Sequence, residues 1–312
     1  MTLDPQAEIL LESIKESGAR PFNAYSAQEA RKIYDQASEL VRGTPPEPFS
    51  IEEIVIPGSD GPILAWIYKP SADSNLPTLI YYHGGGYTIG SLKSHDCVCR
   101  GICVEAQCIV ISIDYRLAPE HKYPAAVQDA WDAAKWVVEH AHTLSVDPKN
   151  IAIGGDSAGG NLTAVVSLLA KAAKNPRFVF QLLIYPCTDM TCSFESHKKF
   201  GEGYRLTNEL IDWFYDHYFS QNDDITHWKA SPLNAKDFSD LPPAFMISAG
   251  YDPLQDENKA YAEKLKNAGV AIKHSHYGGM IHGFLTMPGK IDKAKEGISE
   301  CASELKIIFK KE

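Results

Sequence analysis

The sequence predicts an α/β fold in which eight strands form a mostly parallel sheet that helices cover on both faces. Two observations lead to this prediction. Short apolar runs alternate along the chain with longer segments whose apolar residues recur at helical spacing. In addition, a chain of 312 residues can bury roughly three quarters of its unfolded surface, which is enough for one large core.

The first two expected strands differ from the rest. Residues 50–56 and 63–68 flank the sequence Gly-Ser-Asp-Gly at 58–61, which predicts an antiparallel hairpin at the edge of the sheet. The remaining strands are expected to be residues 78–82, 108–114, 151–154, 181–185, 244–249 and 272–276. Helices over 125–139, 158–171 and 257–268 should connect strands, and apolar residues between 291 and 305 mark a C-terminal helix.

Two stretches fall outside this alternation and suggest a helical cap. Residues 1–45 carry helical apolar stripes, and residues 187–237 are rich in aromatic residues, so we expect an N-terminal helical cap segment and a helical cap insertion. The core then consists of residues 46–186 and 238–312. Because ligands bind at the carboxyl ends of strands in open α/β sheets, the insertion should lie over the binding site.

A candidate nucleophile follows the apolar run at 150–154, in the sequence Gly155-Asp156-Ser157-Ala158-Gly159. A strand that turns at once into a helix holds the residue at its tip in a strained conformation, and flanking glycines remove side chains that would collide there. The pattern predicts that Ser157 is a nucleophile above the sheet. For this motif alone, the alternative is a serine that simply caps a helix.

A second glycine cluster, His-Gly-Gly-Gly-Tyr at residues 83–87, also follows a strand-like run. Consecutive glycines allow backbone N–H groups to approach a developing oxyanion. We therefore expect an oxyanion hole formed by Gly84, Gly85 and Gly86 together with Ala158. A flexible turn and a phosphate-binding loop are the alternatives, but the lysine of a nucleotide P-loop and the third glycine of a dinucleotide motif are both absent after this cluster.

A serine nucleophile needs a base and a carboxylate that orients it. Among the eleven histidines, His282 is the candidate base because it follows the last expected strand, whereas His274 and His276 lie within that strand. Asp252 directly follows the strand at 244–249 and gives the chain order Ser, Asp, His. Asp256 is the rival acid, although a helix N-cap explains it adequately.

Other polar residues near these motifs are expected to be structural. We expect His83 to orient the glycine loop by hydrogen bonding, and Asp156 to point away from the catalytic base. Asp114, Arg116 and Glu120 should form an ion network beneath the site.

Taken together, these motifs resemble those of the hormone-sensitive-lipase-like carboxylesterases, a family of α/β-hydrolases. The resemblance runs over roughly residues 75–286 and rests on the sequences at 83–87, 114–121, 154–161, 252–254 and 281–284. It implies an α/β-hydrolase fold and a Ser157, Asp252 and His282 triad that hydrolyses soluble short- to medium-chain acyl esters through an acyl-enzyme, with no cofactor and no metal.

Two alternative functions remain open at this point. An amidase or deacetylase would use the same triad, and the residues do not separate the two reactions. A non-catalytic small-molecule receptor is the other alternative, because related plant hormone receptors resemble this family but lack a complete triad. All three triad candidates are present here, which favours catalysis.

The cap insertion also supplies candidate substrate-binding residues. Apolar side chains between 206 and 218 recur at helical spacing, so a helix there would present a broad apolar face. We expect Leu210 and Phe214 to line an acyl or alcohol pocket together with Tyr87. Ordinary packing within the cap is the alternative explanation for each of these side chains.

The charge and the composition of the chain limit the classes of molecule that the protein is expected to bind. Thirty basic and forty acidic residues give a net charge of -10, which would repel nucleic acid and anionic lipid headgroups. No secretory signal and no membrane-spanning apolar run is evident, so we expect a cytoplasmic protein without stable membrane association. A small-molecule ester is the expected partner, no nucleic acid is expected to bind, and a homodimer remains open.

Seven cysteines, an odd number, argue against a disulfide framework. Cys97, Cys99, Cys103 and Cys108 lie close together in the sequence and raise the question of a metal site. On a helix that starts near Ser94, however, only Cys99 and Cys103 would share a face. We therefore expect buried thiols and no metal.

Overall fold

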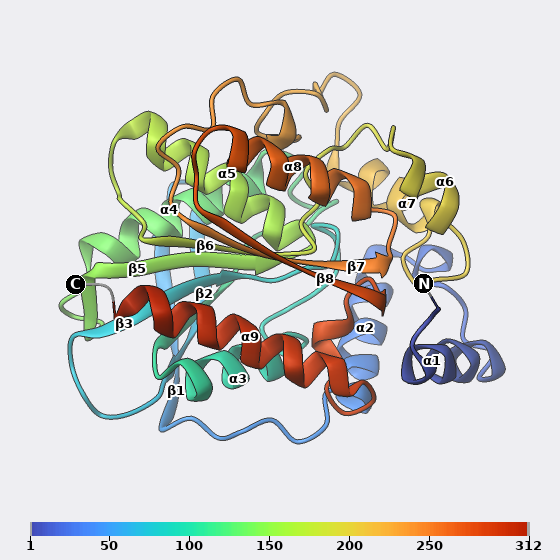
Figure 1. Cartoon of the computed structure of the whole chain (residues 1–312), viewed down its shortest axis with the longest axis horizontal. Coiled ribbons are helices and arrows are strands. Elements are labelled where there is room, and N and C mark those ends of the chain that lie inside the picture. The colour runs from blue at the N-terminus through green and yellow to red at the C-terminus, as the bar shows by residue number, and fades with distance from the viewer. Residues whose placement is uncertain (1, 311–312) are drawn as a thin grey trace.

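In the computed structural model, which describes residues 2–310, eight strands form one sheet in the order β1-β2-β4-β3-β5-β6-β7-β8 (Figure 1). The strands are β1 (Ser50–Gly58), β2 (Gly61–Lys69), β3 (Leu76–Tyr82), β4 (Ile109–Asp114), β5 (Val146–Asp156), β6 (Phe180–Ile184), β7 (Ala244–Tyr251) and β8 (Ile272–Ile281). β2 is antiparallel to both of its neighbours, β1 and β4, and all other pairings are parallel. The predicted edge hairpin and the mostly parallel sheet are confirmed.

Helices cover both faces of the sheet, as the alternating pattern predicts. The helices are α1 (Pro5–Glu16), α2 (Ala27–Val41), α3 (Asp96–Ala106), α4 (Ala125–Glu139), α5 (Ala158–Ala173), α6 (Glu195–Phe200), α7 (Asn208–Tyr218), α8 (Gln255–Asn267) and α9 (Asp292–Phe309). Figure 1 shows α4, α5 and α8 on one face and α3 and α9 on the other. Ile80 and Tyr82 of β3 pack on the α4 and α5 side, whereas Leu79 and Tyr81 pack toward α3 and α9.

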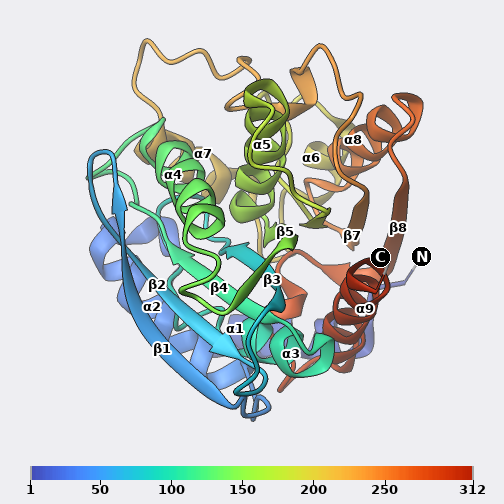
Figure 2. The ribbon, with the colours of Figure 1, turned by 90° about the vertical axis from the view of Figure 1, so that its left-hand side faces the viewer.

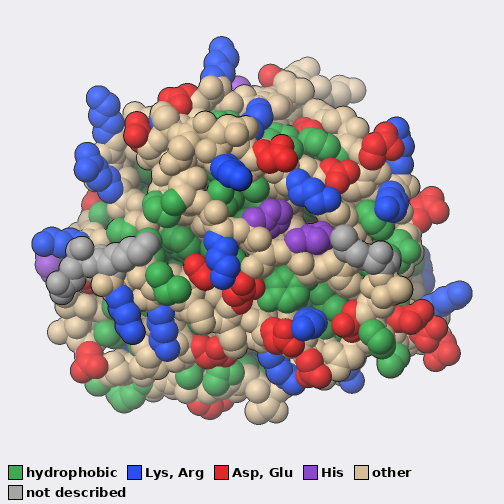
Figure 3. Space-filling model, in the orientation of Figure 1, with side chains coloured by type: hydrophobic (Ala, Val, Ile, Leu, Met, Phe, Trp, Pro, Cys, Tyr) green, Lys and Arg blue, Asp and Glu red, His purple; other side chains and the backbone are tan. Residues whose placement is uncertain are grey.

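The sheet is strongly twisted, and Figure 2 shows the β1–β2 hairpin forming its outer edge. On the face seen in Figure 3, acidic and basic side chains are interspersed. No helix within residues 2–310 combines the length and the apolarity that crossing a membrane requires.

The segments outside the alternation gather at the carboxyl ends of the strands, where Figure 1 shows α2, α6 and α7. Asn161 of α5 ties the insertion to the core, because its side-chain amide donates to the carbonyls of Cys187 and Ala230 at 2.8 and 2.7 Å. The N-terminal segment is held by a bond from the Asp4 amide to the Gly279 carbonyl of β8 at 2.9 Å. The insertion is therefore anchored on α5 and the N-terminal segment on the edge strand β8.

One strand boundary differs from the prediction in a way that affects the site. β8 does not end at His276 but continues to Ile281, because its pairing with β7 resumes after a shift of register at Tyr251. Gly250 makes this close pairing feasible, since a Cβ there would overlap the backbone of Gly278. His282 consequently sits directly at the end of a paired strand.

All seven cysteines are free thiols, and six of them are buried. Cys97, Cys99 and Cys103 of α3 pack in the same apolar cluster as Cys301 of α9. No group of three metal-ligating side chains occurs in the part of the chain that the structure describes.

Candidate active site

Ser157 stands at a sharp turn between the end of β5 and the start of α5. Its backbone has φ 55° and ψ −117°, a conformation that is costly for a residue with a side chain. A Cβ on Gly155 or on Gly159 would overlap the carbonyl oxygen of Tyr82, so both flanking positions require glycine. The turn is fixed from β6 by a bond from the Ser157 amide to the Ile184 carbonyl at 2.9 Å.

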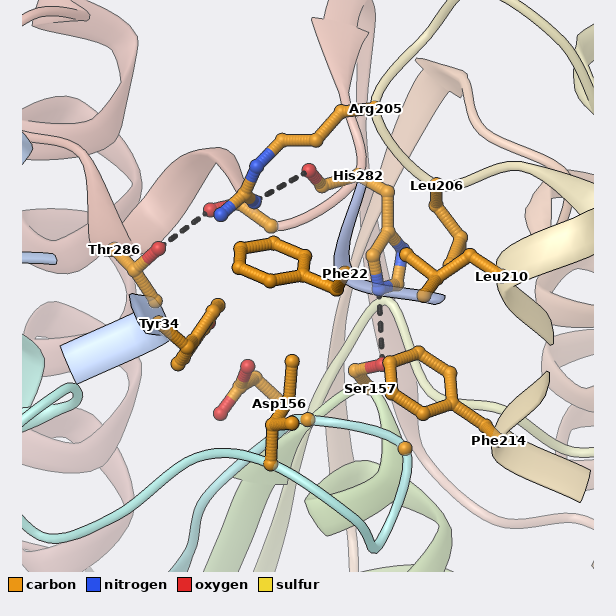
Figure 4. Close-up of a pocket in the computed structure, with 14 residues that line it drawn as sticks. Phe22, Tyr34, Asp156, Ser157, Arg205, Leu206, Leu210, Phe214, His282 and Thr286 are labelled. Atoms are coloured by element: carbon orange, nitrogen blue, oxygen red, sulfur yellow. Dashed lines mark hydrogen bonds between the residues drawn. The ribbon is translucent and has the colours of Figure 1, made fainter. Parts of the chain in front are cut away.

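Three predicted residues meet at this turn. The Ser157 Oγ lies 2.9 Å from Nε2 of His282, and Nδ1 of the same ring lies 2.8 Å from Oδ2 of Asp252 (Figure 4 shows the serine contact). The Asp252 side chain is completely buried, and its Oδ1 accepts a bond from the Leu254 amide at 2.9 Å. A carboxylate beside Nδ1 favours the tautomer that leaves Nε2 free to accept the serine proton.

The competing acid and histidines have other partners. Asp256 lies in the first turn of α8, where Leu254 rather than Asp256 occupies the N-cap, and its Oδ2 accepts a bond from the Ser196 amide at 3.0 Å. The rings of His274 and His276 both contact Oγ of Ser248 on β7, at 2.8 and 2.9 Å. None of them is joined to Ser157.

The glycine loop presents free amides beside the serine. Gly85 and Gly86 have φ values of 122° and 57°, and a Cβ on Gly86 would run into the ring of Phe214. Within residues 2–310, the amides of Gly85, Gly86 and Ala158 donate to no protein acceptor. The prediction of Gly84 as a fourth donor is wrong, because its amide already donates to Oδ1 of Asp156 at 2.9 Å.

Asp156 anchors this loop, a role that we did not predict from the sequence. Its buried carboxylate accepts bonds from the Tyr81 hydroxyl at 2.8 Å and from the Gly84 amide, and it lies 3.3 Å from Nε2 of His95. Burial alone would raise the pKa of Asp156, but the contacts with His95 and Tyr81 outweigh burial and lower it. An ionised carboxylate therefore holds the first glycine of the loop.

His83 supports the same loop from the opposite side, as its position in the motif suggests. Its Nδ1 lies 2.8 Å from the Gly84 carbonyl, and its ring stacks on Tyr115 with centroids 4.4 Å apart. Burial, together with nearby His95, lowers the pKa of His83 to about 3. The ring is therefore neutral, and its Nδ1–H donates to the carbonyl.

The expected ion network of Asp114, Arg116 and Glu120 is not formed. Arg116 pairs with Asp129 of α4 at 2.7 Å, whereas Glu120 pairs with Arg31 of α2 at 2.5 Å. Asp114 lies 4.0 Å from Nε2 of His83, so the three residues belong to separate contacts. Glu120 instead helps to dock the N-terminal segment on the core.

Ser157 lies between two pockets. The first, shown in Figure 4, has a volume of about 520 Å³ including its mouth and is lined by Phe22, Tyr34, Gly85, Gly86, Ile89, Asp156, Ser157, Arg205, Leu206, Leu210, Phe214, His282, Gly283 and Thr286. The second, of about 340 Å³ including its mouth, is lined by Gly86, Tyr87, Ser157, Ala158, Cys187, Leu206, Ile211, Phe214, Tyr215 and Leu254. The structure thus places Leu210 and Phe214 in the first pocket, and Phe214 and Tyr87 in the second.

Several residues that line the first pocket could not be predicted from the sequence. Phe22 and Tyr34 come from the N-terminal segment, where no local pattern distinguishes a residue facing a pocket from one that packs on the core. Arg205 lies just before the apolar stripe of the insertion and is not part of it. Long-range placement of the two segments, rather than local sequence, brings these side chains to the site.

Comparisons with known proteins agree with this geometry. A family model described as an alpha/beta hydrolase fold matches residues 79–286. Carboxylic ester hydrolase LipN from Mycobacterium tuberculosis is 40% identical over 311 residues, covering 98% of this chain and 83% of LipN. Ethyl acetate hydrolase from Pseudomonas putida is 36% identical over 96% of both chains. The solved structure of ester hydrolase EH1AB1 from the Lake Arreo metagenome matches 99% of both chains with a TM-score of 0.96 and 39% identity.

These matches span almost the whole chain, including both segments outside the central alternation. They confirm the resemblance that the short motifs indicate. The chain belongs to the α/β-hydrolase superfamily and, within it, to the hormone-sensitive-lipase-like carboxylesterases.

Proposed function

We propose that this carboxylesterase hydrolyses short- to medium-chain acyl esters through an acyl-enzyme on Ser157, with His282 as the base and Asp252 as the residue that orients it. One observation carries the proposal. Hydrogen bonds of 2.9 and 2.8 Å join hydroxyl, imidazole and carboxylate in the order that serine catalysis needs, and the hydroxyl and the imidazole line a pocket.

The chemistry follows from this order. His282 Nε2 takes the hydroxyl proton while Oγ bonds to the ester carbonyl, and the amides of Gly85, Gly86 and Ala158 stabilise the resulting oxyanion. The alcohol leaves with the proton held by His282. Water then attacks the acyl-enzyme, the same imidazole takes its proton and returns it to the serine, and the carboxylic acid is released. No step requires a metal or an organic cofactor.

The pocket walls support small substrates. The second pocket is lined mainly by apolar and aromatic side chains such as Tyr87, Ile211 and Phe214. Apolar walls of this kind suit the methylene groups of short and medium acyl chains. The name of the relative from Pseudomonas putida, ethyl acetate hydrolase, fits the same substrate range.

The proposal also covers the localisation of the enzyme and the partners that it binds. Seven free thiols suit the reducing cytoplasm. The net charge of -10 disfavours nucleic acid and anionic membranes as partners. One chain supplies the triad, the loop amides and both pockets, so the mechanism works equally in a monomer and in a homodimer.

A substrate panel tests the proposal. The purified protein is assayed on p-nitrophenyl acetate, butyrate, octanoate and palmitate, on an anilide analogue, and in parallel as Ser157→Ala. We expect turnover of the three shorter esters, weak activity on palmitate, and loss of turnover in the variant. Faster cleavage of the anilide would favour the amidase alternative, and stoichiometric binding without turnover would favour the receptor. Undiminished hydrolysis by the variant would remove Ser157 from its role.

A further inference from the structure

Arg205 brings a positive charge to the wall of the first pocket, near Ser157 and His282. Four other arginines, Arg31, Arg42, Arg100 and Arg116, pair with carboxylates; Arg116, for example, pairs with Asp129 at 2.7 Å. Within residues 2–310, Arg205 forms no ion pair, and its guanidinium donates to the His282 carbonyl at 3.4 Å and to the Tyr34 hydroxyl. A half-buried guanidinium in a pocket therefore has donors left for a ligand.

The backbone is shaped to hold this side chain in place. Arg205 has a φ of 72°, in the left-handed region that residues with side chains rarely adopt. Its guanidinium packs over Gly283, where a Cβ would overlap Nη1. Figure 4 shows the guanidinium between Thr286 and the His282 backbone, directed into the pocket above Phe22. Strain at a pocket wall is an observation from which function can be inferred.

The nearest acidic group of the pocket does not neutralise Arg205. Asp156 lies across the pocket, and its oxygens are engaged by Tyr81, the Gly84 amide and His95. Tyr34 lies closer to the guanidinium. Burial raises the pKa of Tyr34, and the positive charge of Arg205 opposes that rise, so the phenol stays protonated and carries no compensating charge.

The position of His282 assigns this pocket to the leaving group. The imidazole must deliver its proton to the departing alcohol, so the alcohol occupies the side of Ser157 that His282 lines. That side is the first pocket, which holds Arg205. The second pocket is lined by Ala158, Cys187 and Leu254 instead, and it receives the acyl group.

We propose that Arg205 binds a carboxylate carried by the alcohol part of the substrate, so that the preferred substrates are short-chain acyl esters of hydroxycarboxylic acids. The inference rests on the proposed esterase function and narrows it. A planar guanidinium matches the two oxygens of a carboxylate, and a bond between two charged groups is stronger than one between neutral groups. Arg205 is thus the residue that selects the leaving group.

Matched substrate pairs test this inference. Acetate release is measured for 4-acetoxybutanoate and for its neutral amide, which differ only in the charge on the alcohol part. Ethanol release is measured for monoethyl succinate and for ethyl succinamate, which place the same difference on the acyl part. We expect kcat/KM to favour the acetoxy carboxylate over its amide by about tenfold or more, with no such preference in the succinate pair.

Variants separate recognition from support of the fold. Arg205→Gln should lower the acetoxy carboxylate-to-amide ratio by about tenfold or more, and Arg205→Lys should retain part of it. The control is Arg177→Gln, which removes the same charge from an exposed position just before β6, at the opposite end of the sheet, and should keep the wild-type ratio.

Three outcomes would overturn the inference: no carboxylate preference in the wild type, a preference in the succinate pair instead, or an equal loss on acid and amide in Arg205→Gln. The last result would make Arg205 a support for the His282 backbone only. Failure of the esterase function itself would look different, because the wild type would then hydrolyse none of the four esters and no p-nitrophenyl ester.

Discussion

The molecule contains two histidine–carboxylate pairs that differ in what surrounds them. His282 lies 2.8 Å from Asp252, and His197 lies 3.4 Å from Glu257, and both carboxylates are completely buried. The free nitrogen of His282 faces the Ser157 hydroxyl, which a strained turn holds beside unengaged loop amides. His197 adjoins the Cys192 thiol instead, and neither residue lines the two pockets described above. A histidine–acid pair becomes catalytic only when the fold adds a nucleophile, oxyanion donors and access for substrate.

The second pair has a structural role. Oε1 of Glu257 accepts bonds from the amides of Thr188 and Asp189, at 2.6 and 3.2 Å, where the insertion leaves the core. His197 belongs to α6 within the same insertion, so the pair joins α8 to two points near the start of the insertion. His282 and Asp252 thus perform chemistry, whereas His197 and Glu257 clamp the cap.

The largest predicted effect tests this contrast directly. Replacing Ser157 or His282 by alanine should lower kcat on p-nitrophenyl butyrate by about a millionfold, because the residues of a triad act as one unit. His197→Ala, a matched loss of a buried imidazole, should change kcat only slightly if thermal denaturation shows that it is folded at the assay temperature. Equal losses in the two histidine variants would erase the distinction between the pairs.

Replacing the carboxylate of each pair by an amide tests the same contrast, with a smaller expected effect on kcat. Asp252→Asn should lower kcat by about ten-thousandfold, because the amide no longer favours the productive tautomer of His282. Glu257→Gln makes the same chemical change in the other pair and should leave kcat near the wild-type value. Steady-state kinetics on one ester measures both variants, and a small effect of Asp252→Asn would argue against its orienting role.

The catalytic side of the molecule could be predicted from the sequence to a large extent. The motif around Ser157 and the glycines at 84–86 encode backbone conformations that few sequences can adopt, so local sequence is informative there. The alternating strands and helices place the ends of β5, β7 and β8 at one edge of the sheet. The positions of Asp252 and His282 follow from that placement.

The pocket and the supporting contacts were much less predictable. Phe22, Tyr34 and Arg205 reach the first pocket through contacts between segments far apart in the chain. The bond between Asp156 and the Gly84 amide spans two strands, and its presence turns an expected oxyanion donor into a fixed part of the loop. Such contacts depend on how layers pack, which the periodicity of one segment does not specify.

A third pair, His95 and Asp156, offers an intermediate case because it touches the oxyanion loop without touching Ser157. Asp156→Asn removes the charge that holds the Gly84 amide, and it should lower kcat by about tenfold to a hundredfold, less than the loss of a triad member. KM should change little, because the loop amides act mainly on the transition state. A rise in KM with normal kcat would instead assign Asp156 to substrate binding in the first pocket.

The smallest effect on catalysis, and the clearest one on stability, concerns pH and the clamp pair. Burial alone would lower the pKa of His197, but Cys192 and Glu257 outweigh burial and raise it to about 10, while burial raises the pKa of Glu257 to about 7. Both shifts mean that the folded protein binds more protons than the unfolded chain. The contribution of protonated His197 to the free energy of unfolding is fully present below its unfolded pKa near 6.5, and it is lost as the pH rises through 10. The loss of stability caused by the raised pKa of buried Glu257 likewise grows as the pH rises from about 4.5 to 7.

The melting temperature should therefore fall as the pH is raised from 6 toward 10, and the fall should be smaller in Glu257→Gln, where His197 loses the carboxylate that raises its pKa. Thermal denaturation of both proteins across this range measures the difference. Asp256→Asn is the control, since it changes an acid on the same helix that lies outside the pair. If the melting temperatures of wild type and Glu257→Gln fell in parallel with rising pH, the pair would not clamp the cap through its charge. Only their positions would then distinguish His197 and Glu257 from His282 and Asp252.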